Sequence, residues 1–186
     1  SVTSMSGSPE DRSWLRGGRI IKTKWVQLKK GQNKQGMDLV KCRFVTQEFA
    51  KGQAREDLFA GTPPLWAARL LVSRVASWSR KHHTLMAMDV SSAFLYADVL
   101  RELYIEIPEE DAEGKVKNMV GRLKKALYGT RDAPQAWQES LTASLEEWGF
   151  QTSKMHPALF HHVERQIDLV IHVDDMLCSG IPENLE

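Results

Sequence analysis

The chain has 186 residues, enough for one domain or one domain with a small lobe, and 42% of them are apolar, as in ordinary globular proteins with a core. No apolar run approaches the roughly 20 residues that a membrane-spanning helix needs, and the first residues lack the apolar core of a signal peptide. We therefore expect no membrane attachment. Cys42 and Cys178 have no metal-ligand spacing and suggest no disulfide framework, which favours a reducing, intracellular setting.

The net charge of +1 is unevenly distributed. Residues 1–51 carry eleven Lys or Arg against four Asp or Glu, a net charge of +7, which leaves −6 for the rest of the chain. A basic lobe beside an acidic one suits an enzyme that handles polyanions, because cations hold phosphates and acids hold metal ions. A charged, solvated surface without a partner explains the same distribution equally well.

The first third of the chain predicts a tail and a hairpin. Residues 1–18 are rich in Ser, Gly and Pro and are expected to be disordered. Strands are predicted at 20–28 and 39–49, joined by a polar hairpin loop at 29–36, and a loop follows at 52–61.

The rest of the chain alternates between helices and strands. A helix is predicted from Pro63 to about residue 81, because Pro favours the first turn. Its apolar positions are Leu65, Leu71, Val72, Val75 and Trp78. A strand at 85–90, a short helix at 91–99, a strand at 103–107 and an acidic loop at 109–117 follow.

A second long helix is predicted after Asp132, which is a good N-cap residue, and Gly149 ends it. Its expected buried stripe consists of Trp137, Leu141, Leu145 and Trp148. Strands at 160–163 and 167–173 complete the pattern, which predicts an α+β fold.

Three aspartates lie in or beside apolar strands. Asp89 stands in the run 85–90, and Asp174 and Asp175 follow the run 167–173. A carboxylate in dry surroundings is costly unless positive charge neutralises it, and three together would repel one another unless they share a divalent cation. Oxygen ligands from Asp suit Mg²⁺, which commonly shares its shell with substrate phosphates. The pattern favours metal-assisted phosphoryl transfer, although a surface turn rich in Asp remains the alternative.

Both members of the acid pair can approach one site only at a tight turn, because neighbouring strand residues face opposite ways. Residues 173–176 are the predicted hairpin tip. A zinc site is disfavoured, because the pairs His82-His83 and His161-His162 lack the spacing of zinc ligands.

Seven segments, in order, make the chain resemble the reverse transcriptase domain of copia-type LTR retrotransposons. The resemblance covers about residues 20–180. The matching segments are the basic strand at 41–45, the helix entry at 58–63, the Met-Asp-Val-Ser-Ser-Ala-Phe-Leu motif at 88–95, the Tyr-to-Pro segment at 103–108, the Leu-Tyr-Gly block at 123–129, the Ala-Pro-Gln-Ala-Trp segment at 133–137 and the His-Val-Asp-Asp motif at 172–175.

The resemblance implies a right-hand polymerase fold with fingers and palm, in which the palm has a ferredoxin-like sheet with two packing helices and the thumb is absent. The implied divisions are a disordered tail at 1–18, fingers-like basic strands at 19–61, a palm at 62–180 with a returning fingers segment at about 103–131, and the truncated start of a following segment at 181–186.

The resemblance further implies nucleotide addition to a primer on an RNA or DNA template. It assigns catalysis to Asp89, Asp174 and Asp175, and two Mg²⁺ ions, with Mn²⁺ as a substitute, to Asp89, Val90, Asp174 and Asp175. The residues implied to contact the deoxynucleoside triphosphate are Lys41, Arg43, Ser92, Ala93, Phe94, Tyr128 and Gly129. Of these, Lys41 and Arg43 would grip the triphosphate and the N–H groups of Ser92 and Ala93 would hold phosphate oxygens. Phe94 would exclude a 2′-hydroxyl, while Tyr128 and Gly129 would lie by the nucleotide.

The implied partners are a primed template and the rest of a polyprotein, which supplies a thumb, ribonuclease H and integrase. The implied location is a cytoplasmic virus-like particle or the nucleus. The sequence departs from the family pattern at three places. His172 replaces a Tyr, Gln-Glu-Phe at 47–49 replaces Lys-Gly-Phe, and Thr-Arg-Asp at 130–132 replaces Leu-Lys-Gln.

Two other functions stay open. The first is a decayed or domesticated remnant that binds nucleic acid without polymerising. The second is an unrelated two-metal nuclease, which would need its acids in a different order and no aromatic residue five positions after the first Asp.

Overall fold

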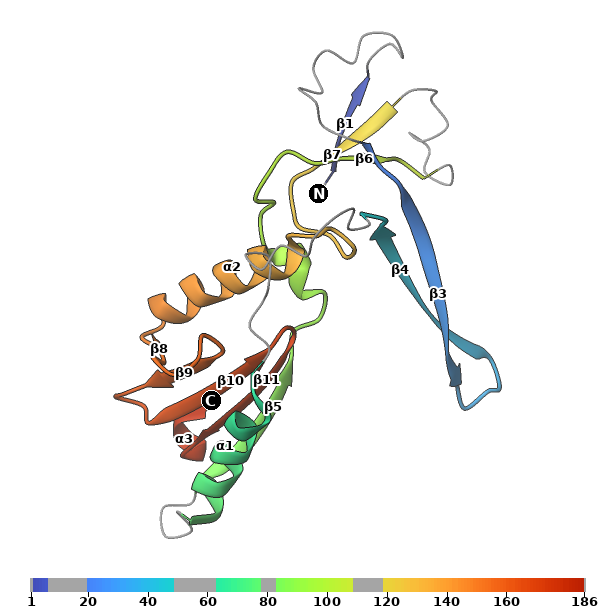
Figure 1. Cartoon of the computed structure of the whole chain (residues 1–186). Coiled ribbons are helices and arrows are strands. Elements are labelled where there is room, and N and C mark those ends of the chain that lie inside the picture. The colour runs from blue at the N-terminus through green and yellow to red at the C-terminus, as the bar shows by residue number, and fades with distance from the viewer. Residues whose placement is uncertain (1, 7–19, 49–62, 78–82, 109–118, 186) are drawn as a thin grey trace.

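The computed structural model describes residues 2–6, 20–48, 63–77, 83–108 and 119–185. One end of the molecule is a five-stranded antiparallel sheet in the order β5-β11-β10-β9-β8 (Figure 1). Its strands are β5 (Thr84–Asp89), β8 (Gln151–Thr152), β9 (Leu159–His162), β10 (Ile167–His172) and β11 (Asp175–Gly180). The strands predicted in these regions are confirmed.

A helix packs on each face of this sheet, because its strands carry apolar side chains on both faces. Helix α1 (Leu65–Ser77) covers Leu159 and Val170. Helix α2 (Ala133–Glu147) lies on the opposite face, where Leu145 packs against Leu169 and Ile171. The short helix α3 (Pro182–Leu185) follows β11 and adds Leu185 to this second core.

The apolar positions predicted for the first helix are confirmed in part, since Leu71 is buried and Val75 is half-buried. The buried residues of α1 are Ala67 and Leu71, one turn apart, while Leu65 and Val72 face solvent. Ala67 is fully buried because its small side chain lets the helix approach the strands closely. Periodicity alone did not favour an alanine over its larger apolar neighbours. Trp78 and the predicted end of this helix lie outside the described residues.

Helix α2 begins and ends where the sequence predicts. Asp132 is its N-cap residue and Pro134 lies in its first turn. At the other end Gly149 has φ +90°, and its N–H donates to the Glu146 carbonyl while the Phe150 N–H donates to the Leu145 carbonyl. These two bonds form a Schellman motif. Trp137 and Leu145 are buried as predicted, but Trp148 is wrongly placed in the stripe, because it is the C-cap residue and is 66% exposed.

The other end of the molecule is a four-stranded sheet in the order β1-β7-β6-β2 (Figure 1). Its strands are β1 (Val2–Ser6), β2 (Ile20–Ile21), β6 (Tyr104–Glu106) and β7 (Met119–Leu123). The disorder expected for 1–18 is therefore wrong for Val2–Ser6, which pair antiparallel with β7. A pairing over more than a hundred residues leaves no local signal in the sequence. Ile21, Ile105 and Leu123 form the core of this lobe.

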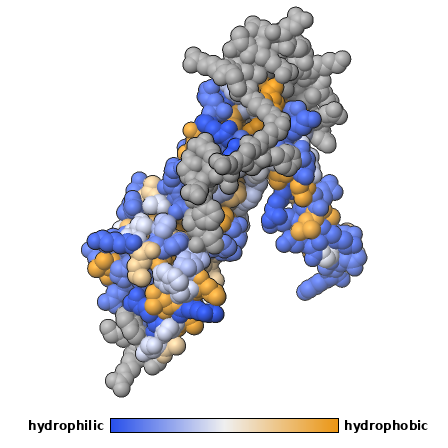
Figure 2. Space-filling view, viewed as in Figure 1, coloured by the Kyte–Doolittle hydropathy of each residue, from blue (hydrophilic) through white to orange (hydrophobic). Residues whose placement is uncertain are grey.

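The predicted hairpin is formed by β3 (Thr23–Gln32) and β4 (Asp38–Thr46). The loop expected at 29–36 starts later, because β3 continues to Gln32, and residues 20–21, expected in the first hairpin strand, form β2 of the other sheet. The Asn33 side chain accepts hydrogen bonds from the N–H groups of Gln35 and Met37 and so closes the loop. The hairpin is a two-stranded sheet of its own and stands away from the body, with open space between them (Figure 2). Most of its side chains are exposed.

The remaining predictions concern a short helix and two loops. The short helix predicted at 91–99 is a single 3₁₀ turn, η4 (Ala93–Tyr96). The loops predicted at 52–61 and 109–117 lie outside the described residues. Within the described residues, every helix is too short or too polar to span a lipid bilayer.

The Schellman motif makes Gly149 a testable stability position. A Cβ atom there would meet the His162 Nε2 atom at 3.1 Å, and the φ of +90° disfavours any L side chain. We expect Gly149→Ala to lower the free energy of unfolding by roughly 1 kcal/mol or more, measured by urea denaturation. Ala143→Gly, within the same helix, is the control for a helix-propensity effect. An unchanged unfolding midpoint for Gly149→Ala would contradict this account of the helix end.

Candidate functional site

The register between β5 and β11 places two of the three aspartates directly opposite each other. Asp89 is the last residue of β5 and pairs with Asp175, the first residue of β11. Opposed residues of antiparallel strands have Cα atoms about 4.5–5.5 Å apart and project to the same face. Both aspartates are exposed. The dry surroundings expected for them are therefore wrong, since they lie where the two strands end.

Asp174 lies in the turn that joins β10 to β11. His172 pairs with Asp175, so the turn itself consists of Val173 and Asp174, one residue earlier than the predicted tip. The Val90 N–H donates to the Asp174 carbonyl oxygen at 2.9 Å. The third aspartate is thereby fastened to the end of the strand that carries Asp89.

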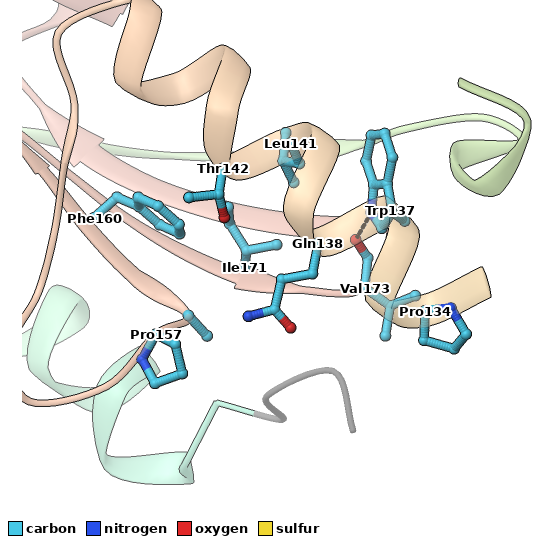
Figure 3. A pocket seen from close by; sticks show the side chains of 10 residues that line it. Pro134, Trp137, Gln138, Leu141, Thr142, Pro157, Phe160, Ile171 and Val173 are labelled. Carbon is cyan, nitrogen blue, oxygen red and sulfur yellow. Dashed lines mark hydrogen bonds between the residues drawn. The ribbon is translucent and has the colours of Figure 1, made fainter. Parts of the chain in front are cut away.

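The turn is strained and is held by a hydrogen bond from α2. Val173 has φ +60°, which is rare for a β-branched residue and costs on the order of 1–3 kcal/mol. The indole Nε1 of Trp137 donates to the Val173 carbonyl at 2.6 Å (Figure 3). Sequence reasoning assigned Trp137 to packing alone. The available signal was that a buried indole N–H needs an acceptor.

The three carboxylates are close in the fold without forming a closed cage. Among the described residues, no group of three His, Cys, Asp or Glu side chains is arranged to hold a metal ion. None of the ion pairs between described residues includes Asp89, Asp174 or Asp175. Neighbouring carboxylates without a cation repel one another, and their oxygens are the type of ligand that Mg²⁺ takes together with water and phosphate oxygens.

A groove of about 370 Å³ lies beside Asp175, on the face of the sheet that α1 covers. His172 and Asp175 line its polar side, and Pro64, Leu65 and Leu177 contribute apolar walls. His172, which stands where the family pattern has Tyr, thus lines the same groove as Asp175.

An aromatic pair stands next to the aspartates. The rings of Phe94 and Tyr128 have centroids 4.7 Å apart, and Phe94 also packs against the core that includes Ala93 and Trp137. Burial raises the pKa of the Tyr128 hydroxyl, and the negative charges of Asp174 and Asp89 raise it further, while the positive charge of Arg43 acts in the opposite direction. Tyr128 is therefore close enough to both the acids and a hairpin cation to feel their charges.

The hairpin is attached to the body at the Tyr128–Gly129 turn. Thr46, the last residue of β4, donates its N–H to the Tyr128 carbonyl at 2.8 Å. Gly129 has φ +91°, and a Cβ atom there would lie 2.0 Å from the Thr46 carbonyl oxygen. Only glycine allows this contact, so the structure gives Gly129 a packing role.

The other predicted contacts lie around these groups. Lys41 and Arg43 are two residues apart on β4 and therefore share one face of the hairpin. Ser92 has φ +59° and precedes η4, in which Ala93 is buried. Their predicted roles toward a nucleotide remain predictions, as does the role of Val90 toward a metal ion.

Comparison with known proteins identifies the family. The family model described as reverse transcriptase (RNA-dependent DNA polymerase) matches residues 13–184. The chain belongs to this family. The resemblance stated from the sequence motifs is confirmed.

The relatives are much longer than this chain. The Retrovirus-related Pol polyprotein from transposon TNT 1-94 of Nicotiana tabacum is 29% identical over 91% of this chain and 13% of its own length. The corresponding polyprotein from transposon RE2 of Arabidopsis thaliana is 27% identical over 87% of the chain and 11% of its own length. The Transposon Ty1-BL Gag-Pol polyprotein of Saccharomyces cerevisiae is 30% identical over 90% of the chain and 9% of its own length. The chain thus spans about a tenth of these relatives.

The effect of the neighbouring charges on the pKa of Tyr128 can be measured directly. Because the Asp174 charge disfavours the phenolate, we expect Asp174→Asn to lower the pKa of Tyr128, and Arg43→Gln to raise it. Phenolate absorbance against pH reports this pKa, and Tyr128→Phe assigns the signal among the three tyrosines. Circular dichroism confirms that the protein stays folded over the titration. If Asp174→Asn leaves the Tyr128 titration unchanged, the two groups are not neighbours.

Proposed function

We propose that this chain is the RNA-directed DNA polymerase domain of a copia-type retrotransposon polyprotein, which adds deoxynucleotides to a primer by two-metal phosphoryl transfer. The observation that carries the proposal is the pairing of Asp89 with Asp175, with Asp174 in the adjoining turn. Membership of the reverse transcriptase family supports it. In this proposal the five-stranded sheet is the palm, and the β3–β4 hairpin with the small sheet forms the fingers.

Each site residue has a defined part in the proposed reaction. Asp89, Val90, Asp174 and Asp175 would hold two Mg²⁺ ions, or Mn²⁺ in their place. Bound there, the ions would neutralise charge on the attacking and leaving oxygens of an in-line displacement. The protein contributes mainly position and charge.

The nucleotide lies, in this proposal, between the hairpin and the aspartates. Arg43 and Lys41 bind the triphosphate from the hairpin, and the N–H groups of Ser92 and Ala93 take phosphate oxygens from the other side. Tyr128 and Gly129 border the base and sugar. The support for this placement is that Arg43 and the acids have opposed effects on the pKa of Tyr128, so that both are near it.

The proposed partners follow from the longer relatives. A primed RNA or DNA template occupies the open space beside the palm, and His172 contacts the primer end from the groove that it shares with Asp175. Thumb, ribonuclease H and integrase segments would come from the rest of a polyprotein in a virus-like particle or the nucleus.

Primer extension with Mg²⁺ or Mn²⁺ tests the proposed function. We expect Asp174→Asn to reduce nucleotide incorporation by roughly 100-fold or more, because it removes one charge from the metal site. The matched control is Glu164→Gln, which neutralises an exposed acid in the turn between β9 and β10, at the far end of β10 from the aspartates.

The chain should be assayed alone and extended by a thumb segment from its own polyprotein, since weak grip on the duplex would limit the chain alone. If the extended version binds a primed template but incorporates no nucleotide, the remnant that only binds nucleic acid is the correct alternative. If Asp174→Asn extends as well as its parent, the assigned metal site is wrong.

Phe94 provides a test of sugar selection. Truncating a side chain that excludes a hydroxyl group is expected to change discrimination by about 10- to 200-fold. We expect Phe94→Ala to raise ribonucleotide incorporation relative to deoxynucleotide incorporation within that range, measured as the ratio of kcat/KM values. Phe94→Tyr keeps the ring and should retain the parent ratio. Equal selectivity in Phe94→Ala and the parent would remove Phe94 from the nucleotide site.

A further inference from the structure

We propose that Glu48, Arg101 and Asp132 form an ionic clasp that positions the β3–β4 hairpin, and with it Arg43, over the three aspartates. The part of this inference that concerns the nucleotide rests on the proposed polymerase function. Glu48 and Asp132 belong to two of the segments in which the sequence departs from the family pattern. In the fold, these two acids contact the same arginine, Arg101.

The geometry of the clasp is well defined. The Arg101 Nη2 donates to both oxygens of Glu48, at 2.6 Å and 2.8 Å. Its Nε lies 3.3 Å from the Asp132 Oδ2, and its Nη2 lies 3.4 Å from the Asp132 Oδ1. The backbone N–H of Arg131 donates to Glu48 Oε2 at 2.9 Å, so the Glu48 carboxylate is bound from two segments.

Because Glu48 and Asp132 are largely buried, both carboxylates need the positive charge of Arg101. The side chains of Glu48 and Asp132 are only 16% and 7% exposed, while that of Arg101 is 45% exposed. Two carboxylates in such surroundings would repel one another without the guanidinium between them. Burial by itself lowers the pKa of Arg101, but the hydrogen bond and charge of Glu48 and the charge of Asp132 outweigh it, and the net shift is upward.

The Asp132 side chain contacts Arg101 and does not cap the helix that it precedes. It is the N-cap residue of α2, yet its side chain makes no capping hydrogen bond to the helix. Its Oδ2 atom is buried without an aligned hydrogen bond and faces the Arg101 guanidinium at contact distance. An Asp at this position usually stabilises its helix by a capping hydrogen bond. Because Asp132 contacts Arg101 instead, the ionic contact has a structural role separate from capping.

The clasp joins three segments that lead directly to the site. Glu48 follows β4, and its N–H donates to the Gly129 carbonyl at 3.3 Å. Asp132 comes three residues after Gly129 and five before Trp137, whose indole holds the turn that contains Asp174. A two-stranded hairpin is only marginally stable by itself. Its orientation relative to the aspartates therefore depends on the contacts at its base, and the clasp is the charged part of them.

A double-mutant cycle tests the clasp. We expect Arg101→Gln and Glu48→Gln each to raise the KM for deoxynucleotide by roughly 10- to 100-fold with a smaller change in kcat, because Arg43 is misplaced and the aspartates are not. The double substitution should cost no more than the worse single one, since both remove the same interaction. Arg101→Lys keeps a cation between the two acids and should recover part of the loss.

The matched control is the ion pair between Arg122 and Glu102, at 2.8 Å, whose side chains are both about half exposed. It lies in the same region of the chain and joins the segment before β6 to β7. Arg122→Gln and Glu102→Gln should leave KM within about twofold of the parent value, because exposed pairs contribute little. A KM increase in the controls equal to that of the clasp variants would overturn the inference.

A distance measurement separates this inference from the proposed function. Spin labels at Lys34→Cys on the hairpin loop and Glu164→Cys on the five-stranded sheet, in a Cys42→Ser background, report how the hairpin is placed. We expect Arg101→Gln to broaden or shift the distance distribution, and Arg122→Gln to leave it unchanged. An unchanged distribution in Arg101→Gln overturns the clasp even if the protein polymerises. A shifted distribution in a protein that incorporates no nucleotide supports the clasp while the proposed function fails.

Discussion

Six residue pairs join β5 to β11, and the last of them sets Asp89 opposite Asp175. The register is fixed by hydrophobic burial on both faces of the sheet. Met86 and Cys178 point to the core under α2, while Leu85 and Leu177 point to the core under α1. A slip of one residue would exchange the two faces, bury the wrong side chains and separate the carboxylates. The core of the sheet thus determines the geometry of the acidic site.

The turn that carries Asp174 is kept in place by contacts on both sides. Val90 donates to the Asp174 carbonyl from the end of β5, and Trp137 donates to the Val173 carbonyl from α2. The positive φ of Val173 is an unfavourable conformation that persists only when its surroundings fix it. Strand, turn and helix therefore form one packed unit that holds the acids.

The sequence was sufficient for the elements whose signals are local. The Pro-rich start of α1, the glycine that ends α2, the hairpin loops and the apolar runs before the aspartates all predicted their elements. Helical periodicity did not decide which apolar residues face the sheet, so Val72 and Trp148 were expected inside and lie outside. Long-range pairing was also invisible, both for Val2–Ser6 with β7 and for Glu48 with Arg101, which are 53 residues apart. These contacts arise from tertiary packing and have no periodic or motif signature.

The two lobes of the site differ in how firmly they are held. The aspartates stand on a sheet with a core on each face, whereas Arg43 stands on a hairpin that is exposed along most of its length. Charges of opposite sign thus act on Tyr128, the acids from the sheet and the cation from the hairpin, which is attached through its base. A triphosphate with its metal ions would neutralise both sets of charge at once. In the proposed reaction, the nucleotide and its metal ions would bridge the hairpin and the palm, and the contacts at residues 46–48 and 129–132 would set the placement of the hairpin relative to the acids.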